Sequence, residues 1–154
     1  MKVDLEAFWR TGVFGLIRLG MTPADVLDIV GEPEDRTVPS ISPEIWKLGP
    51  CEVMFEHNRV ISIEVKPDEH DRTWNAIDLE PESLRRLGSM TPATFSDYAQ
   101  RAGLAIVRTV HPSYRPDATT ILLENCVRIV FEGEHMMATS VLAPIEAQSS
   151  KTKR

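Results

Sequence analysis

The sequence predicts an α+β fold of two tandem helix–helix–sheet repeats, with three or four strands in each repeat and the helices on one face of a continuous antiparallel sheet. Two observations lead to this prediction. The halves of the chain share short motifs in the same order, and each half passes from helical spacing of apolar residues to alternating, strand-like runs. We assign residues 1–67 to the first repeat, 68–77 to a linker, 78–144 to the second repeat and 145–154 to a disordered tail.

The shared motifs begin with Asp-Leu-Glu at residues 4–6 and again at 78–80. Leu-Gly-Met-Thr-Pro-Ala at 19–24 then corresponds to Leu-Gly-Ser-Met-Thr-Pro-Ala at 87–93. Further along, Cys51 and the Phe-Glu pair at 55–56 correspond to Cys126 and the Phe-Glu pair at 131–132. Because the order is kept along the whole chain, an internal duplication is favoured over coincidence.

The repeated Met-Thr-Pro-Ala motif predicts the start of a helix in each half. Thr22 is a candidate N-cap, proline suits the first helical position, and Asp25 stands where a capping-box acid belongs. Thr91 and the proline after it repeat this arrangement, and the two helices should end at Gly31 and Gly103. Apolar residues at 5–17 and at 84–87 predict a less regular helix before each of them.

Alternating apolar residues predict the strands. We expect strands at 44–48, 52–56 and 59–65 in the first half, and at 104–110, 119–123, 127–132 and 135–142 in the second. His57-Asn58 and Gly133-Glu134 should form tight hairpin turns, because asparagine and glycine tolerate positive φ. Together these segments predict a joined sheet of about seven or eight strands.

The stretch Leu-Gly-Met-Thr-Pro-Ala-Asp-Val-Leu-Asp-Ile-Val-Gly-Glu-Pro at 19–33 resembles the opening helix of small α+β modules in bacterial outer-membrane-assembly lipoproteins. Its tandem use resembles the β-lactamase inhibitor protein fold, in which a concave sheet is presented to a protein partner. Similar segments occur in proteins that look like immunity proteins of bacterial toxin systems. The resemblance therefore implies binding and neutralisation of a cognate toxin or enzyme, whereas a role in outer-membrane assembly is not carried over.

The composition of the chain limits the classes of partner and the compartment that we expect. The net charge of -6 argues against a nucleic-acid binder and leaves room for a basic protein partner. The N-terminal residues do not follow the pattern of a secretory signal, and no apolar run approaches the roughly 20 residues that span a bilayer. With two cysteines in the chain, we expect a cytoplasmic protein with no membrane partner.

The sequence shows no catalytic motif, so we predict no catalytic residue, no metal and no cofactor. It contains no nucleophile elbow, phosphate-binding glycine loop or dinucleotide-binding turn. The Asp-Glu-His-Asp cluster at 68–71 falls in the expected linker, where four consecutive residues rarely converge on a metal. Cys51 and Cys126 occupy corresponding places and are interpreted as small core residues rather than nucleophiles.

A sheet with helices on one face leaves its other face free for a partner. Strand alternation places Glu52, Met54 and Glu56 there in one half and Arg128, Val130 and Glu132 in the other, although a register shift of one residue would exchange the faces. Aromatic residues often anchor interfaces, so Trp46 and Tyr114 join this set. Tyr114 lies in a proline-rich loop that is equally well explained as a connection pinned by its own tyrosine.

Three functions are compatible with these features. The first is a non-catalytic inhibitor or immunity protein that binds a protein partner, and is a monomer or homodimer when unbound. The second is a scaffold that self-associates through exposed sheet edges. The third is a small enzyme or ligand-binding protein whose site has no recognisable motif.

Overall fold

The computed structural model describes residues 1–37, 43–66, 77–80, 83, 89–113 and 115–143. The described helices are α1 (Leu5–Thr11), α2 (Pro23–Val30) and α4 (Pro92–Ala102). The described strands are β1 (Lys2–Val3), β2 (Asp35–Arg36), β3 (Glu44–Leu48), β4 (Cys51–Glu56), β5 (Arg59–Val65), β6 (Asp78–Leu79), β7 (Ile106–Val110), β8 (Ala118–Leu123), β9 (Val127–Glu132) and β10 (His135–Leu142).

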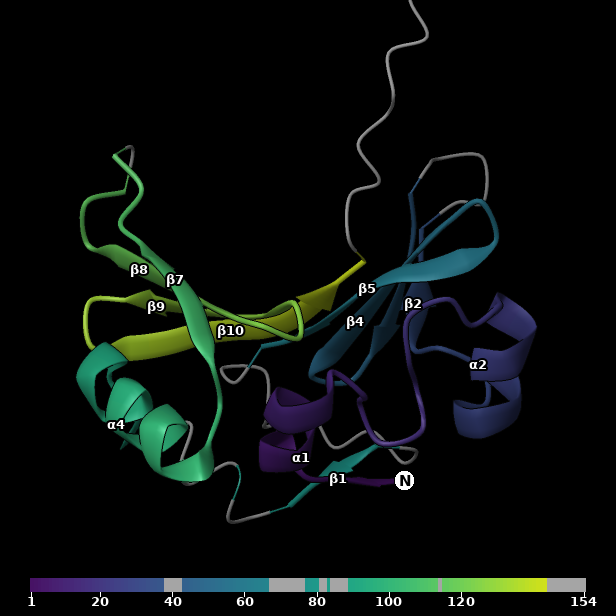
Figure 1. Ribbon diagram of the computed structural model, residues 1–154. Coiled ribbons are helices and arrows are strands. Elements are labelled where there is room, and N and C mark those ends of the chain that lie inside the picture. Colours follow the sequence, from purple (N-terminus) through teal and green to yellow (C-terminus); the bar gives the residue numbers. More distant parts are fainter. Residues whose placement is uncertain (38–42, 67–76, 81–82, 84–88, 114, 144–154) are drawn as a thin grey trace, which may run out of the picture.

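Eight of these strands form one antiparallel sheet in the order β2-β3-β4-β5-β10-β9-β8-β7. Each half of the chain contributes four consecutive strands, and the halves meet where β5 pairs with β10, with Ile63 opposite Val141 and Val65 opposite Thr139. Figure 1 shows the sheet bending so that the β7–β8 end and the β3–β5 end rise on the same side. The two halves of the chain therefore form one continuous sheet, and they share one core.

The predicted fold class is wrong. The described part of the chain is dominated by strands, with three helices and a separate two-stranded parallel sheet of β1 and β6, and it does not consist of two helix–helix–sheet repeats with helices on one face. The two Asp-Leu-Glu motifs show why the prediction failed. Asp4 caps α1, whereas Asp78 and Leu79 form β6 and pair with Lys2 and Val3. A short shared motif does not fix secondary structure when its tertiary partners differ.

The first predicted helix is also shorter than expected. α1 ends after seven residues because Gly12 adopts a left-handed conformation at φ +70° and its N–H bonds the carbonyl of Phe8. Leu16 is consequently 63% exposed instead of lying on an apolar helix face. The apolar residues predicted for the matching helix of the second half, Leu84 and Leu87, lie outside the described residues, as do 68–76 of the expected linker and the expected tail.

The predictions that rest on local signals are confirmed. Thr22 and Asp25 form the capping box of α2, and Thr91 caps α4 with Thr94 in the corresponding role. His57 and Asn58 turn the β4–β5 hairpin at φ +49° and +59°. Both helices end at the predicted glycines, Gly31 and Gly103.

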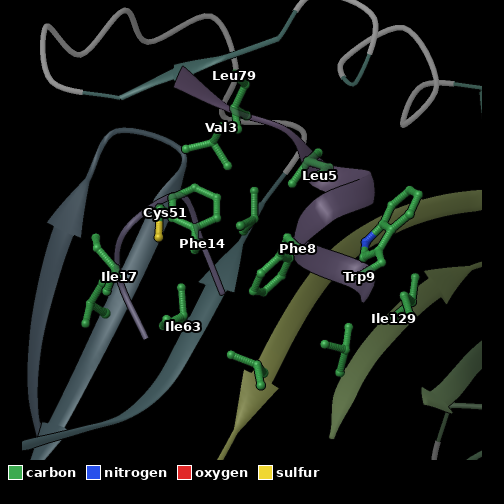
Figure 2. Close-up of a cluster of buried hydrophobic side chains, with 14 of the residues drawn as sticks. Val3, Leu5, Phe8, Trp9, Phe14, Ile17, Cys51, Ile63, Leu79 and Ile129 are labelled. Atoms are coloured by element: carbon green, nitrogen blue, oxygen red, sulfur yellow. The ribbon is translucent and has the colours of Figure 1, made fainter. Parts of the chain in front are cut away.

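Large apolar side chains from α1 and the segment after it fill the core beneath the sheet (Figure 2). The rings of Phe8 and Phe14 meet edge to face with centroids 5.6 Å apart, and Trp9 meets Phe95 of α4 at 5.3 Å. Phe95 in turn lies 6.2 Å from Phe131 of β9. Burial of these rings holds α1 and α4 against the same face of the sheet. None of the described helices is both long and apolar enough to cross a membrane.

Candidate functional site

The sheet face that points away from α1 and α4 is called the open face below. Alternation along β4 and β9 buries Val53 and Ile129 in the core and leaves their neighbours partly exposed on the other side. The predicted residues Glu52, Met54, Arg128, Val130 and Glu132 therefore lie on the open face, in the predicted register. Glu56 is exposed at the end of β4, opposite Arg59.

Trp46 is not on this face, and its assignment as an exposed anchor is corrected. It lies opposite Val53 in the β3–β4 pair, so alternation directs it to the core, where it is 4% exposed. Its ring packs on Phe55 at 4.7 Å, and its Nε1 donates a hydrogen bond to Oε1 of Glu44 at 2.7 Å. The Trp46 indole therefore makes its contacts inside the fold. Tyr114 lies outside the described residues.

One row of side chains crosses the open face from edge to edge, because each member is the cross-strand partner of the next. From β2 to β7 the row contains Asp35, Lys47, Glu52, Glu64, Ser140, Arg128, Leu122 and Arg108. Both glutamates stand on β4 and β5, and both arginines stand on β9 and β7. Before Ser140 the row holds three acidic residues and Lys47, and after it two arginines and no acidic residue, so its net charge changes from negative to positive at Ser140.

Ion pairs lie on both sides of this change, two of them made by Lys66 and one by Arg115. Glu52 and Glu64 face each other directly, an arrangement that is unfavourable between like charges. The Nζ of Lys66 lies 2.8 Å from Oε1 of Glu52 and 3.9 Å from Oε1 of Glu64, so the lysine offsets this repulsion. On the other side, Arg115 pairs with Glu132.

A concavity of about 510 Å³ lies between these ion pairs on the open face. Its charged lining consists of Glu64, Lys66, Arg115 and Arg128. The remaining lining is small or apolar and comes from Pro112, Ala118, Thr120, Val130, Met137 and Ala138. The concavity therefore combines charged and apolar groups, and a hollow in which polar groups converge beside apolar ones is a candidate binding site.

Two polar atoms beside the concavity have no hydrogen-bond partner among the described residues: Nε of Arg128 and Oγ of Ser140. Ser140 is 1% exposed and stands between Glu64 and Arg128, both of which line the concavity. Buried polar groups are nearly always hydrogen-bonded, and leaving one without a partner is costly. Two such atoms on adjacent strands are therefore the most distinctive feature of the open face.

Arg128 was predicted on this face from the sequence, whereas Ser140, Glu64 and Lys66 were not. Simple alternation along β10 fails because the strand changes register between Met136 and Ala138. Glu64 stands on β5, the strand at which the two halves join, and Lys66 follows its end. The pairing of β5 with β10 is not encoded locally. Only the alternation within β5, read together with that pairing, would have placed Glu64 beside Ser140.

The two cysteines lie in different surroundings. Cys51 is fully buried, and desolvation, reinforced by Glu52 and Glu64, raises the pKa of its thiol. Cys126 is half-buried in the turn before β9 at φ +66°, so the prediction of a core residue is right for Cys51 and wrong for Cys126. Val127 occupies the buried place at the start of β9.

The described residues also form further hollows, but no metal site. Within the described ranges, no group of three or more His, Cys, Asp or Glu side chains could hold a metal ion, and the cluster at 68–71 falls outside these ranges. Two further hollows lie away from the open face: one of about 310 Å³ beside Trp9 and Asn125, and one of about 560 Å³ beside Asp25 and Arg59. In the first, the Asn125 amide donates to the Trp9 carbonyl, and in the second Asp25 caps α2.

No protein-family model, no curated protein and no solved structure matches this chain. The resemblance to inhibitor and immunity proteins therefore stays a prediction.

Proposed function

We propose that this chain is a non-catalytic protein-binding protein, and that its open face covers a protein partner. The observation that carries the proposal is the row of cross-strand neighbours on the open face, which crosses all eight strands, carries charged side chains on six of them and changes the sign of its net charge at Ser140. Such a row, beside apolar residues such as Met54 and Val130, combines contact area with electrostatic specificity.

Charge complementarity describes the partner. A surface that fits the open face carries a basic group over Glu52 and Glu64 and an acidic group over Arg128 and Arg108. The net charge of -6 attracts a partner with an overall basic surface at longer range. Both features agree with an immunity protein that neutralises a cognate toxin or enzyme by occupying its surface.

Co-expression with the product of the adjacent gene tests this function. We expect a stable 1:1 complex, measured by light scattering, in which amide exchange slows on β5, β9 and β10. Met54→Arg and Val130→Arg should abolish the complex, because each places an unpaired charge in the contact. Gln100→Arg is the matched control, since Gln100 is exposed on α4.

The experiment distinguishes failure of the open-face assignment from failure of the proposed immunity function. A complex that survives both open-face variants contradicts the assignment of this face. The absence of any complex with the co-expressed product contradicts the proposed immunity function.

A second candidate function, self-association, is favoured by the edge strand β7. This strand ends the eight-stranded sheet, and it exposes Ile106 at 36% and Val107 at 57%. An exposed apolar edge can pair with the same edge of a second copy. Light scattering over a range of concentrations should then show a dimer that Val107→Lys dissociates, whereas a monomer at every concentration contradicts it.

A further inference from the structure

We propose that Arg128 and Ser140 form a carboxylate-binding site on the open face, which receives an aspartate or glutamate side chain of the protein partner. This inference rests on the proposed function. It goes beyond that function by naming the atoms that bind and the chemical group that they select.

The donors are present and have no partner in the described part of the chain. Nε of Arg128 and Oγ of Ser140 lack hydrogen bonds, and the two residues are direct cross-strand partners on the open face. Side chains that face each other in an antiparallel pair have Cβ atoms about 5 Å apart. One carboxylate can therefore accept from both, because it has two oxygens with several lone pairs.

The two glutamates that flank the site among the described residues are paired with cations. Glu64, on the far side of Ser140, has its Oε1 3.9 Å from Nζ of Lys66, and Glu132, further along β9, pairs with Arg115. Two of the three cations that line the concavity, Lys66 and Arg115, thus have an acidic neighbour. The third lining cation is Arg128, and its Nε has no hydrogen-bond partner among the described residues.

The charge balance selects a single carboxylate over a phosphate. Lys66 is shared between Glu52 and Glu64, and Arg115 pairs with Glu132, so Arg128 is the lining cation to which the described residues supply no ion-pair partner. A phosphate group carries nearly two negative charges at neutral pH and would meet the Glu64 carboxylate in the wall. A guanidinium edge also matches the planar, bidentate geometry of a carboxylate.

Access to the site is provided by the concavity. Arg128 lines the hollow and is only half-buried, so rotation of its side chain turns Nε toward an entering group. Ser140 stays fixed in β10. Val130 and Ala138 place aliphatic surface beside the site, and a partner that covers them would exclude water from the ion pair and so strengthen it.

The free protein can be tested without its partner. N-acetyl-aspartate amide is titrated against the isotope-labelled chain while the Nε–H signal of Arg128 and the amide signal of Ser140 are followed by NMR. We expect saturable shifts with a dissociation constant on the order of millimolar, which is typical of one charge-assisted site. N-acetyl-asparagine amide, of the same shape, should give no saturable shift.

Variants assign the binding to the two residues. Arg128→Gln should weaken binding about tenfold or more, and Arg128→Lys should weaken it by less because the charge is kept. Arg101→Gln, an exposed arginine on α4, is the matched control and should bind as the unmodified chain does. Ser140→Ala should weaken binding without lowering the unfolding temperature, whereas a purely structural serine would lower it.

These experiments distinguish failure of the carboxylate site from failure of the proposed protein-binding function. Equal binding of the asparagine compound, tighter binding of inorganic phosphate, or unchanged binding by Arg128→Gln would each overturn the carboxylate site. A 1:1 complex of the whole protein that forms in spite of that result would leave the protein-binding function standing. Saturable binding of the aspartate compound without any complex would retain the site and reject the partner.

Discussion

The indole Nε1 of Trp9 donates a hydrogen bond of 3.1 Å to Oγ1 of Thr139, a residue 130 positions away. Trp9 is 1% exposed and Thr139 is completely buried, so water cannot replace this bond. It joins α1, from the first half of the chain, to β10, from the second half. The contact therefore holds the two halves together directly beneath the strand that carries Ser140.

We predict that Thr139→Val lowers the free energy of unfolding by about 1–3 kcal/mol, because the indole N–H is left buried without an acceptor. Trp9→Phe should cost more, since it also removes part of a core ring. Urea denaturation of both single variants and the double variant gives the coupling energy. Thr120→Val, at a half-buried site on β8, should change stability by less than about 0.5 kcal/mol. Strictly additive effects at Trp9 and Thr139 would contradict the hydrogen bond.

The capping box of α2 predicts an acid-sensitive contribution to stability. The Asp25 carboxylate accepts from the backbone N–H of Thr22 at 2.8 Å and from its hydroxyl at 2.7 Å, and these bonds lower the pKa of Asp25. A lowered pKa in the folded state stabilises the fold above the carboxyl's unfolded pKa, and this stabilisation is lost as the pH falls through the folded pKa. The difference in stability between the unmodified chain and Asp25→Asn should therefore shrink on acidification from about pH 5 to about pH 2.

Urea midpoints measured across this pH range test the capping box. Thr22→Ala removes the hydroxyl of the same box and should cost about 1 kcal/mol at neutral pH. A difference for Asp25→Asn that stays constant across the range would show that the carboxylate does not stabilise the helix through its charge.

The two cysteines should differ sharply in reactivity. A thiol reacts as its thiolate, and burial both raises the pKa of Cys51 and blocks access to it. Cys126 is only half-buried in a turn. A chromogenic disulfide reagent should therefore titrate one thiol in the native protein and two in denaturant. Cys126→Ser should abolish the native reaction, and Cys51→Ser should leave it; the opposite pattern would place Cys51 at the surface.

The local features of this fold were predictable, and the features that depend on distant pairing were not. The β4–β5 hairpin is encoded by alternation and by two turn residues that tolerate positive φ, all within one short segment. The two Asp-Leu-Glu motifs misled the fold prediction because β6 exists through its pairing with β1, far away in the sequence. Propensity cannot reveal such a partner.

The residues of the candidate site also fall into those that local alternation predicts and those that depend on distant pairing. Arg128 was placed on the correct face because β9 alternates without interruption. Ser140 was missed because a bulge changes the register of β10, and its neighbour Glu64 belongs to the other half of the chain. Trp46 was assigned wrongly because its aromatic ring was interpreted as an interface anchor, whereas the alternation with Lys47 places it with Leu48 on the buried face.

The pair of opposed glutamates on the open face provides the last prediction. Lys66 lies between Glu52 and Glu64, and all three side chains are about one-third exposed. Lys66→Met should therefore destabilise the fold by about 0.5–1 kcal/mol at low ionic strength, a modest effect because solvent screens the charges. The loss should diminish in about 0.5 M NaCl, where exposed charges interact weakly.

A second substitution distinguishes charge repulsion from lost packing. Adding Glu52→Gln to Lys66→Met removes one of the two facing carboxylates, so it should recover most of the stability lost at low salt. Urea midpoints at the two salt concentrations measure both effects. If the double variant is no more stable than Lys66→Met, the lysine acts through its aliphatic stem instead of its charge, and the acidic half of the row needs no counter-ion to fold.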